Sequence, residues 1–408
     1  MNRAESMQAG GEFSLRERYI GEVLIFLLFF SMACLPFVPQ ELGFSIIFFV
    51  LAYMGGGLFW LYAASRYKII TLKGCVFFAF FCVVMSLNCW KAISEGVGVE
   101  GWLRSFVPMA FFLSSLFLYF YVRMLGAHAI FLFLLIACFV YCMKLLVLDF
   151  DSIVSVFSIG GRLSYYSLDV VVPFPYLGVM IAILLPGILL CLRIFLFLFF
   201  LFFVFIVGYK SQVVFLVFFL VMHCLTFFYG LKRLAIVFLG AAAVLFICLG
   251  MQDYLVERLA SIGGGGDQVR LLEIKYAWSL FLESPVLGAG LGTSIPLIET
   301  RPDYYKLQHL WVSDSVSYIH NFFFYLLMTG GGAFLLFFSI FSLWGGVFRI
   351  RSYFSENVYV RLAAWTSAGL IVFWLTSASF KQMQTVIILC VLFSVSALLL
   401  NKGSECEQ

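Results

Sequence analysis

Long apolar runs separated by short polar segments dominate the chain. Many of them reach about 18 residues or more, the length that a helix needs to cross the hydrocarbon core of a bilayer. The run 194–207, for example, is apolar at nearly every position. The pattern therefore predicts an all-α, polytopic integral membrane protein with about 12 transmembrane helices. The expected spans are 19–38, 43–64, 69–90, 105–122, 127–148, 170–191, 194–209, 213–229, 234–251, 317–345, 362–380 and 385–401.

The composition supports this fold class. Hydrophobic residues make up 64% of the chain and charged residues only 11%. Soluble domains are about half apolar and about a quarter charged, so an ordinary soluble domain is excluded. The net charge of +4 is small and scattered along the chain, which argues against a nucleic-acid-binding surface.

Lys and Arg residues in the short loops indicate the orientation, because such loops carry more positive charge on the cytoplasmic side. With both termini in the cytoplasm, each proposed cytoplasmic connection holds at least one positive charge. The basic residues on that side are Arg16, Arg18, Arg66, Lys68, Lys73, Arg123, Arg193, Lys232, Arg233, Arg349, Arg351, Arg361 and Lys402.

The 11 cysteines predict no disulfide framework, because none of them falls in an expected external loop. Cys138 and Cys142 share a helix face without neighbouring His or carboxylate residues. We therefore interpret them as small core residues rather than metal ligands.

The spans divide the chain into three parts. Residues 1–251 hold spans 1–9, residues 252–316 form a large external loop, and residues 317–408 hold spans 10–12 and a short tail. The loop is the longest hydrophilic segment. Within it, we expect Asp267 to cap a helix that starts around Gln268 and ends near Ser284–Pro285, where proline stops it.

This loop helix carries one apolar stripe. Leu271, Ile274, Trp278 and Phe281 recur at helical spacing, with Leu282 alongside. An amphipathic helix in an external loop is expected to lie on the bilayer surface or on the helix bundle.

Gly288, Gly290 and Gly292 follow the helix at every second position. Such spacing permits turns with exposed N–H groups, which could form an anion-binding nest, or a plain tight loop. It is not a dinucleotide-binding fingerprint, because no strand precedes it and Pro296 interrupts the segment that follows.

Three basic sites lie at the external ends of the expected spans or in the loop. Arg270 lies in the first turn of the loop helix, His320 precedes Asn321 at the start of the tenth span, and Arg162 follows Gly160–Gly161 near the sixth. The alternative for His320 and Asn321 is an interfacial polar pair that caps a helix or faces water, and for Arg162 a snorkelling side chain. The three sites could converge on one cavity if the external loops fold together.

Asp149 and Asp151 flank Phe150 with the spacing of a metal-binding motif found in nucleotide-sugar transferases. Two carboxylates could hold a divalent cation with substrate phosphates, but two ligands alone define no site. Solvation at a helix end explains the pair without a metal.

Three segments in order resemble the bacterial O-antigen ligase and polymerase superfamily. They are Arg270-Leu-Leu-Glu-Ile, then Glu283-Ser-Pro-Val-Leu-Gly-Ala-Gly-Leu-Gly292, then Tyr318-Ile-His-Asn321 followed by Leu326, Leu327 and Gly330. The segment Gly208-Tyr-Lys-Ser-Gln212 looks like a degenerate form of a Ser-Arg motif of that family. Gln212 stands where Arg is expected, so no role is transferred to it.

The resemblance implies a multi-pass enzyme of the bacterial inner membrane whose active face is periplasmic. Its donor would be an oligosaccharide on undecaprenyl pyrophosphate, and the reaction would need no metal and no cofactor. His320 and Arg270 are then the expected catalytic residues. The expected substrate-binding residues are Arg162, Asn321, Gly288, Gly290 and Gly292. Membrane lipids and a chain-length regulator or flippase of the same pathway would be its partners.

Three functions remain open at this point. A polymerase joins lipid-linked repeat units, whereas a ligase transfers the finished glycan to lipid A–core. The weak Ser-Arg motif and the lack of an acidic residue after His320–Asn321 favour the polymerase. A flippase or transporter for lipid-linked sugars is the third reading, but the chain shows no repeated halves and its polar residues concentrate in external loops.

Overall fold

The computed structural model describes residues 13–35, 44–67, 72–159, 173–207, 215–220, 265–296, 315–316, 319–375 and 382–405. Within these residues, 7 helices are long and apolar enough to cross a membrane. They confirm the all-α, polytopic membrane fold. The expected spans 213–229 and 234–251 lie almost wholly outside the described residues, so the number twelve stays a prediction. The 7 segments are Ile46–Tyr67, Gly74–Ser94, Val99–Leu125, Ala127–Leu148, Leu190–Val207, Phe322–Trp344 and Met383–Leu400.

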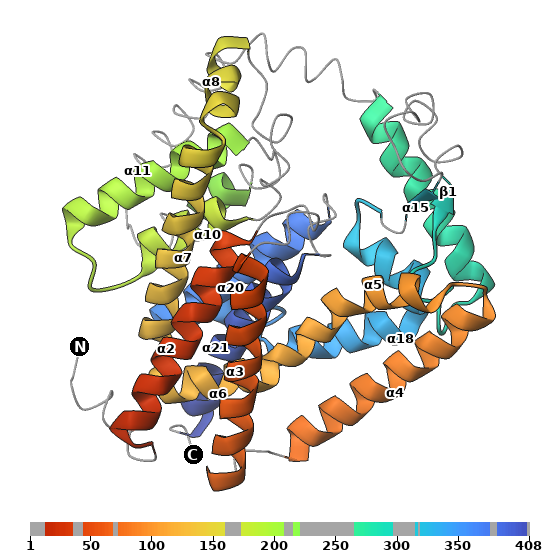
Figure 1. Cartoon of the computed structure of the whole chain (residues 1–408), viewed down its shortest axis with the longest axis horizontal. Coiled ribbons are helices and arrows are strands. Elements are labelled where there is room, and N and C mark those ends of the chain that lie inside the picture. The colour runs from red at the N-terminus through yellow and green to blue at the C-terminus, as the bar shows by residue number, and fades with distance from the viewer. Residues whose placement is uncertain are drawn as a thin grey trace.

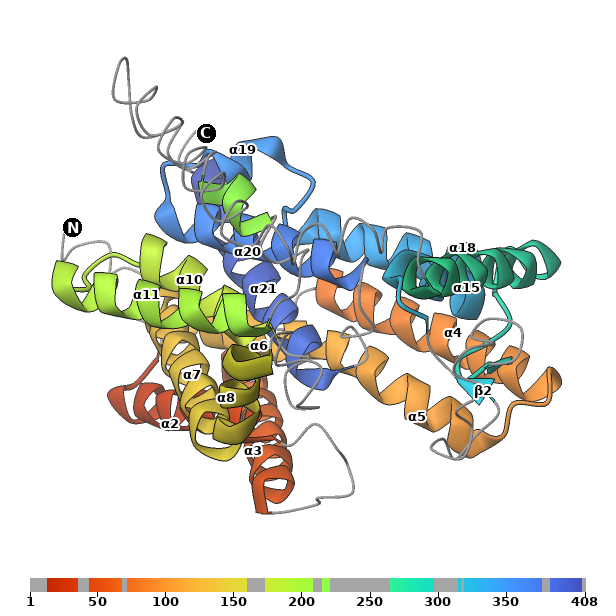
Figure 2. The same cartoon turned by 90° about the horizontal axis from the view of Figure 1, so that it is seen from above.

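The helices form two groups (Figures 1 and 2). One group holds α2 (Leu15–Cys34), α3 (Phe44–Tyr67), α6 (Ser114–Leu125), α7 (Ala127–Leu148), α10 (Phe174–Leu184), α11 (Leu190–Val207) and α20 (Val358–Trp374). The other holds α4 (Leu72–Ser94), α5 (Val99–Ala110), α15 (Gly265–Glu283) and α18 (Phe322–Trp344). Helix α21 (Met383–Glu405) contacts members of both groups, namely α20, α6, α5 and α18. Most of its apolar segment is buried inside the protein, so it is the central helix of the fold.

Two of the expected boundaries are wrong. The sixth and seventh spans are separated by a turn between Leu184 and Leu190, because Pro186 cannot continue a helix and Gly187 adopts a φ of 83°. The fourth span is longer than expected. It consists of α5, the 3-10 turn η1 (Phe111–Leu113) and α6, with Pro108 inside α5.

Short helices occupy two of the connections. Helix α8 (Phe150–Ile159) begins directly after α7, within the stretch that was expected to be an external loop. Asp149 is the residue between the two helices, and Asp151 lies in the first turn of α8, where a carboxylate interacts favourably with the helix dipole. Helix α19 (Ile350–Tyr353) precedes α20.

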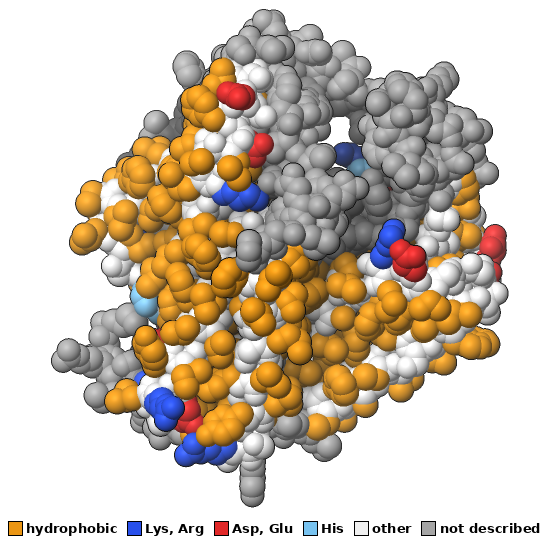
Figure 3. All heavy atoms as spheres, viewed as in Figure 1, with side chains coloured by type: hydrophobic (Ala, Val, Ile, Leu, Met, Phe, Trp, Pro, Cys, Tyr) orange, Lys and Arg blue, Asp and Glu red, His pale blue; other side chains and the backbone are white. Residues whose placement is uncertain are grey.

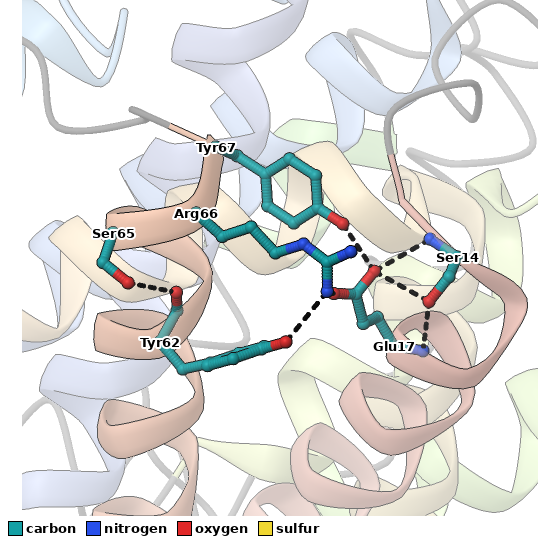
Figure 4. A network of polar contacts seen from close by, with 6 residues as sticks. All are labelled: Ser14, Glu17, Tyr62, Ser65, Arg66 and Tyr67. Atoms are coloured by element: carbon teal, nitrogen blue, oxygen red, sulfur yellow. Dashed lines mark hydrogen bonds and ion pairs between the residues drawn. The ribbon is translucent and has the colours of Figure 1, made fainter.

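A polar network joins the start of α2 to the end of α3 (Figure 4). Ser14 and Glu17 form a capping box, in which each side chain accepts the backbone N–H of the other. The buried Glu17 carboxylate also accepts the Tyr67 hydroxyl at 2.6 Å and pairs with Arg66 at 3.1 Å. The Tyr67 hydrogen bond is the main cause that lowers the pKa of Glu17 below its ordinary 4.5. The network fixes the relative position of two helices at one end of the bundle.

The same end of the bundle gathers basic residues that were assigned to the cytoplasm. Arg18 donates to the Met124 carbonyl at the end of α6, next to Arg123. In Figure 3 charged side chains gather where α2 begins and α3 ends, while hydrophobic side chains cover the surface over α3, α4 and α5. The orientation that the positive charges predict stays a prediction.

The opposite end of the bundle holds the other termini of these helices. Lys144 near the end of α7 donates to the Leu35 carbonyl directly after α2, at 3.1 Å. Asn321 at the start of α18 donates to the Leu375 carbonyl directly after α20, also at 3.1 Å. The loop helix α15 packs on α18 and contacts its N-terminal end.

Candidate functional site

Helix α15 supplies one half of the site. It runs from Gly265 to Glu283, so its end agrees with the expectation, whereas its start lies earlier than expected. Asp267 is therefore a residue of the first turn and not the N-cap. The face that packs on the protein carries Glu273 and Ala277, which are 1% and 0% exposed. The predicted apolar stripe lies beside this face and is largely exposed.

Helix α18 supplies the other half. Asn321 is its N-cap, and its side-chain oxygen accepts the Phe324 N–H at 3.2 Å. The capping alternative for Asn321 is therefore confirmed. Its side-chain oxygen caps the start of α18, and its side-chain nitrogen donates to the Leu375 carbonyl at the end of α20. His320 directly precedes the N-cap, so it lies at the N-terminus of α18.

The two halves meet in a contact between Glu273 and His320. The His320 backbone N–H donates to Oε2 of Glu273 at 2.9 Å, and the ring Nδ1 lies 3.1 Å from Oε2 and 3.2 Å from Oε1. An ionised carboxylate can only accept, so Nδ1 carries the proton that it donates. The other ring nitrogen, Nε2, is then the acceptor in the neutral imidazole. The His320 side chain is 32% exposed and the Glu273 side chain 1%, so the carboxylate lies behind the ring and away from solvent.

This arrangement has the features of a general base with an orienting group. The carboxylate fixes the tautomer and the ring plane, and it stabilises the imidazolium that forms when Nε2 takes a proton. Glu273 is the residue that sequence reasoning missed. It stands within the segment that carries the family resemblance, but one glutamate on a loop helix gives no sign of burial by itself.

Arg270 lies one turn before Glu273 on α15. Residues three apart in a helix are neighbours on its surface, so Arg270 and Glu273 are neighbours on the surface of α15. The Arg270 side chain is exposed. The structure thus brings Arg270, Glu273 and His320 to one region, while Arg162 and the segment 208–212 lie outside the described residues.

The glycine turn after α15 uses its N–H groups inside the protein. Gly288 donates to the Ser284 carbonyl, and Ala289 and Gly290 donate to the carbonyls of Met328 and Thr329 in α18, at 2.8 to 3.0 Å. Amides that already donate to the protein are poor candidates for an anion nest. The structure therefore favours the tight-loop alternative for Gly288 and Gly290, and Gly292 continues the same turn with a φ of 88°.

The turn fills a break in α18. Gly331 has φ 58° and ψ −151°, which interrupts the helix. On the far side of the break, the N–H groups of Gly332 and Ala333 donate to the carbonyls of Pro285 and Val286 at 2.8 and 3.1 Å. Backbone groups that a broken helix leaves without partners are thus satisfied by the loop, as burial in an apolar setting requires.

Asn88 of α4 holds this junction from the side. Its amide nitrogen donates to the Thr329 carbonyl at 2.6 Å, and its oxygen accepts the Leu291 N–H at 2.9 Å and the Trp102 indole N–H at 3.3 Å. Asn88 is 1% exposed. One buried amide therefore connects α4, α5, the glycine turn and α18.

A cleft of about 450 Å³ opens beside the glycine turn, between the α4–α5 connection and the end of α15. Glu273 and His320 are not among its lining residues, so this cleft is separate from their contact. Its polar lining comes from Lys91, Glu95, Glu283, Ser284, Thr293 and Ser294.

The metal alternative at Asp149 and Asp151 gains no further ligands. Among the described residues, no group of three or more His, Cys, Asp or Glu side chains is close enough together to hold a metal ion. Cys138 and Cys142 are both fully buried in α7, which confirms their interpretation as core residues.

The fold and the contact define a multi-span membrane protein with a histidine–carboxylate pair at one end of its bundle. Residues 195–339 match the family model described as O-Antigen ligase. The match confirms the resemblance to the O-antigen ligase and polymerase superfamily, which implies a glycosyltransferase-like enzyme. The matched region contains α15, the glycine turn and His320, so the site lies within it. No curated protein matches the chain significantly.

Proposed function

We propose that the protein is a glycosyltransferase of the bacterial inner membrane that acts on its periplasmic face. Its donor is a glycan on undecaprenyl pyrophosphate, and its product is a lengthened O-antigen-type chain. Both termini lie in the cytoplasm. The observation that carries the proposal is the His320 ring held by the buried Glu273 carboxylate within the region that matches the family model.

The contact suits the proton transfer of this reaction. A hydroxyl of the acceptor sugar attacks the anomeric carbon of the donor, and its proton passes to Nε2 of His320. The bond from the anomeric carbon to the pyrophosphate oxygen breaks, and the leaving group takes the electron pair. Glu273 keeps Nε2 as the acceptor and balances the charge of the imidazolium.

Arg270 suits the leaving group. Negative charge grows on the pyrophosphate as the bond breaks, and a guanidinium can bind two phosphate oxygens at once. Its place one turn from Glu273 on α15 supports this role. Arg162 is a second candidate for the same role, from its place in the sequence near the external end of the sixth expected span.

Chain polymerisation is the preferred reaction, because the Ser-Arg motif is weak and no acidic residue follows Asn321. Ligation to lipid A–core is the second candidate, and the description of the matching family model favours it. The two reactions share the donor and the proposed residues, so only the acceptor distinguishes them.

The test supplies the purified protein with a lipid pyrophosphate-linked repeat unit, with and without lipid A–core, and separates the products by mass. Lengthened lipid-linked chains identify a polymerase, and glycan on the core identifies a ligase. Donor that crosses the membrane unchanged would contradict both and indicate a flippase. Activity that survives a chelator removes any role for a metal at Asp149 and Asp151.

A further inference from the structure

The outer face of α15 is apolar, and the described part of the chain leaves it uncovered. Leu271, Trp278 and Leu282 are 54%, 45% and 61% exposed, and Val286, which follows the helix after Ser284 and Pro285, is 68% exposed. These three helix positions are separated by seven and four residues, so they lie on one side of the helix. The opposite flank of the stripe is polar, with Ser279 and Glu283 both exposed.

Basic residues border the stripe on both sides. At 100° per residue, Arg270 follows the buried face of Glu273 and Ala277, then comes the apolar stripe, and then Lys275. Both basic side chains are exposed. An apolar stripe between two cations is the pattern of a helix that lies in the plane of a membrane interface, where long basic side chains reach the phosphate groups.

The surface of the neighbouring span continues this stripe. Helix α15 packs along α18, and Figure 2 shows the two helices side by side. The Trp278 ring meets Phe324 of α18 edge-on at 6.4 Å. Phe323, Leu336 and Ile340 on α18 are themselves exposed apolar residues of a membrane-crossing helix. Tryptophan is also enriched at the level of the lipid headgroups, which suits Trp278.

The geometry points to α15 as an interfacial helix whose stripe of Leu271, Trp278 and Leu282 inserts into the lipid bilayer beside α18. Insertion of such a stripe buries it about 5–10 Å below the headgroups. Arg270 then lies at the level of the lipid phosphates. If the proposed function holds, that is where the pyrophosphate of a lipid-linked donor is presented, so the helix positions Arg270 for the leaving group.

The test maps lipid contacts on the full-length protein in nanodiscs of phosphatidylethanolamine and phosphatidylglycerol. A phospholipid with a diazirine in its acyl chain is photolysed, and the modified residues are located by mass spectrometry. We expect adducts on Trp278 and Leu282 and none on Ser279 or Glu283. Leu336 and Ile340 of α18 serve as the positive control. Adducts on α18 alone, or crosslinks from α15 to a second copy of the chain, would overturn the insertion.

A pair of variants on the same helix tests the consequence for the donor. Leu282→Glu places a charge in the stripe, and Ser279→Glu places the same charge on the polar flank. We expect Leu282→Glu to lose its adducts and to raise the apparent KM for the lipid-linked donor about tenfold, with Ser279→Glu close to wild type. An unchanged KM in Leu282→Glu would refute the link to the donor. The lipid adducts of the wild-type protein require no turnover, so failure of the proposed function would leave the first test intact.

Discussion

The substitution Glu273→Gln isolates the charge behind His320. Glutamine has nearly the same shape, and its carbonyl oxygen can still accept the His320 backbone N–H, so the start of α18 keeps its contact. What disappears is the negative charge 3.1 Å from Nδ1. At an effective dielectric constant of about 20, that separation corresponds to about 5 kcal/mol between full charges.

This Coulomb energy overstates the loss, because the His320 side chain is 32% exposed and water screens it. A hydrogen bond to a charged group contributes about 1.5–3 kcal/mol net. If the imidazolium forms only during the reaction, its loss of stabilisation in Glu273→Gln raises the activation free energy by this amount and lowers kcat roughly 10- to 150-fold. KM for the donor should change little, because Glu273 acts through His320.

The assay is steady-state turnover of a lipid pyrophosphate-linked repeat unit by protein in nanodiscs, with the melting temperature measured on the same samples. Glu100→Gln is the matched control, because it removes an exposed carboxylate that pairs with its neighbour Arg104 across one helical turn of α5. A Glu273→Gln variant with wild-type kcat would refute the orienting role. So would a loss of activity that follows a loss of stability.

Three further predictions concern the support of the site and the end of the bundle. Asn88→Ala removes three hydrogen bonds, of which the Thr329 carbonyl keeps a second donor in the Gly290 N–H. The substitution should destabilise the fold by about 3 kcal/mol in a denaturant titration, whereas the exposed Ser94→Ala should change little. Gly290→Ala should prevent correct folding, because φ at this residue is 97° and the new Cβ would lie 2.5 Å from the Cα of Ala92. The control Gly57→Ala should fold normally, because its new Cβ would have no neighbouring atom within 4 Å. Gel filtration of both variants tests this difference. Glu17→Gln should cost about 1 kcal/mol near neutral pH. The pKa of Glu17 is lowered in the folded protein, so the stability that its charge contributes is complete above the ordinary value of 4.5 and is lost as pH falls through the folded value. The difference in melting temperature between wild type and Glu17→Gln should therefore shrink in acid. A difference that grows in acid would contradict the role of the Glu17 charge.

Local patterns were sufficient to predict much of the fold. Apolar runs of sufficient length marked the spans, and the spacing of apolar residues together with Pro285 marked the end of α15. The role of Asn321 as a helix cap follows from its residue type and its place before an apolar run. Each of these features depends on residues close together in the sequence.

The contacts that build the site join residues far apart in the chain. Glu273 meets a partner 47 positions away, and Asn88 meets the Thr329 carbonyl 241 positions away. Their burial depends on how α4, α15 and α18 pack together, which periodicity does not encode. The glycine turn is ambiguous in the sequence for the same reason, because the Ala289 and Gly290 amides donate to the carbonyls of Met328 and Thr329, just before the break of α18 at Gly331.

The most direct test of the central claim compares wild type with His320→Ala in the turnover of a lipid pyrophosphate-linked glycan. Both proteins are purified in the same membrane mimic and checked for equal insertion and melting temperature. The account predicts a loss of at least about 10²-fold in kcat, the typical contribution of a general base, and a comparable failure of Arg270→Ala. Normal product from His320→Ala would contradict it, because no catalytic role would then remain for the ring that Glu273 holds.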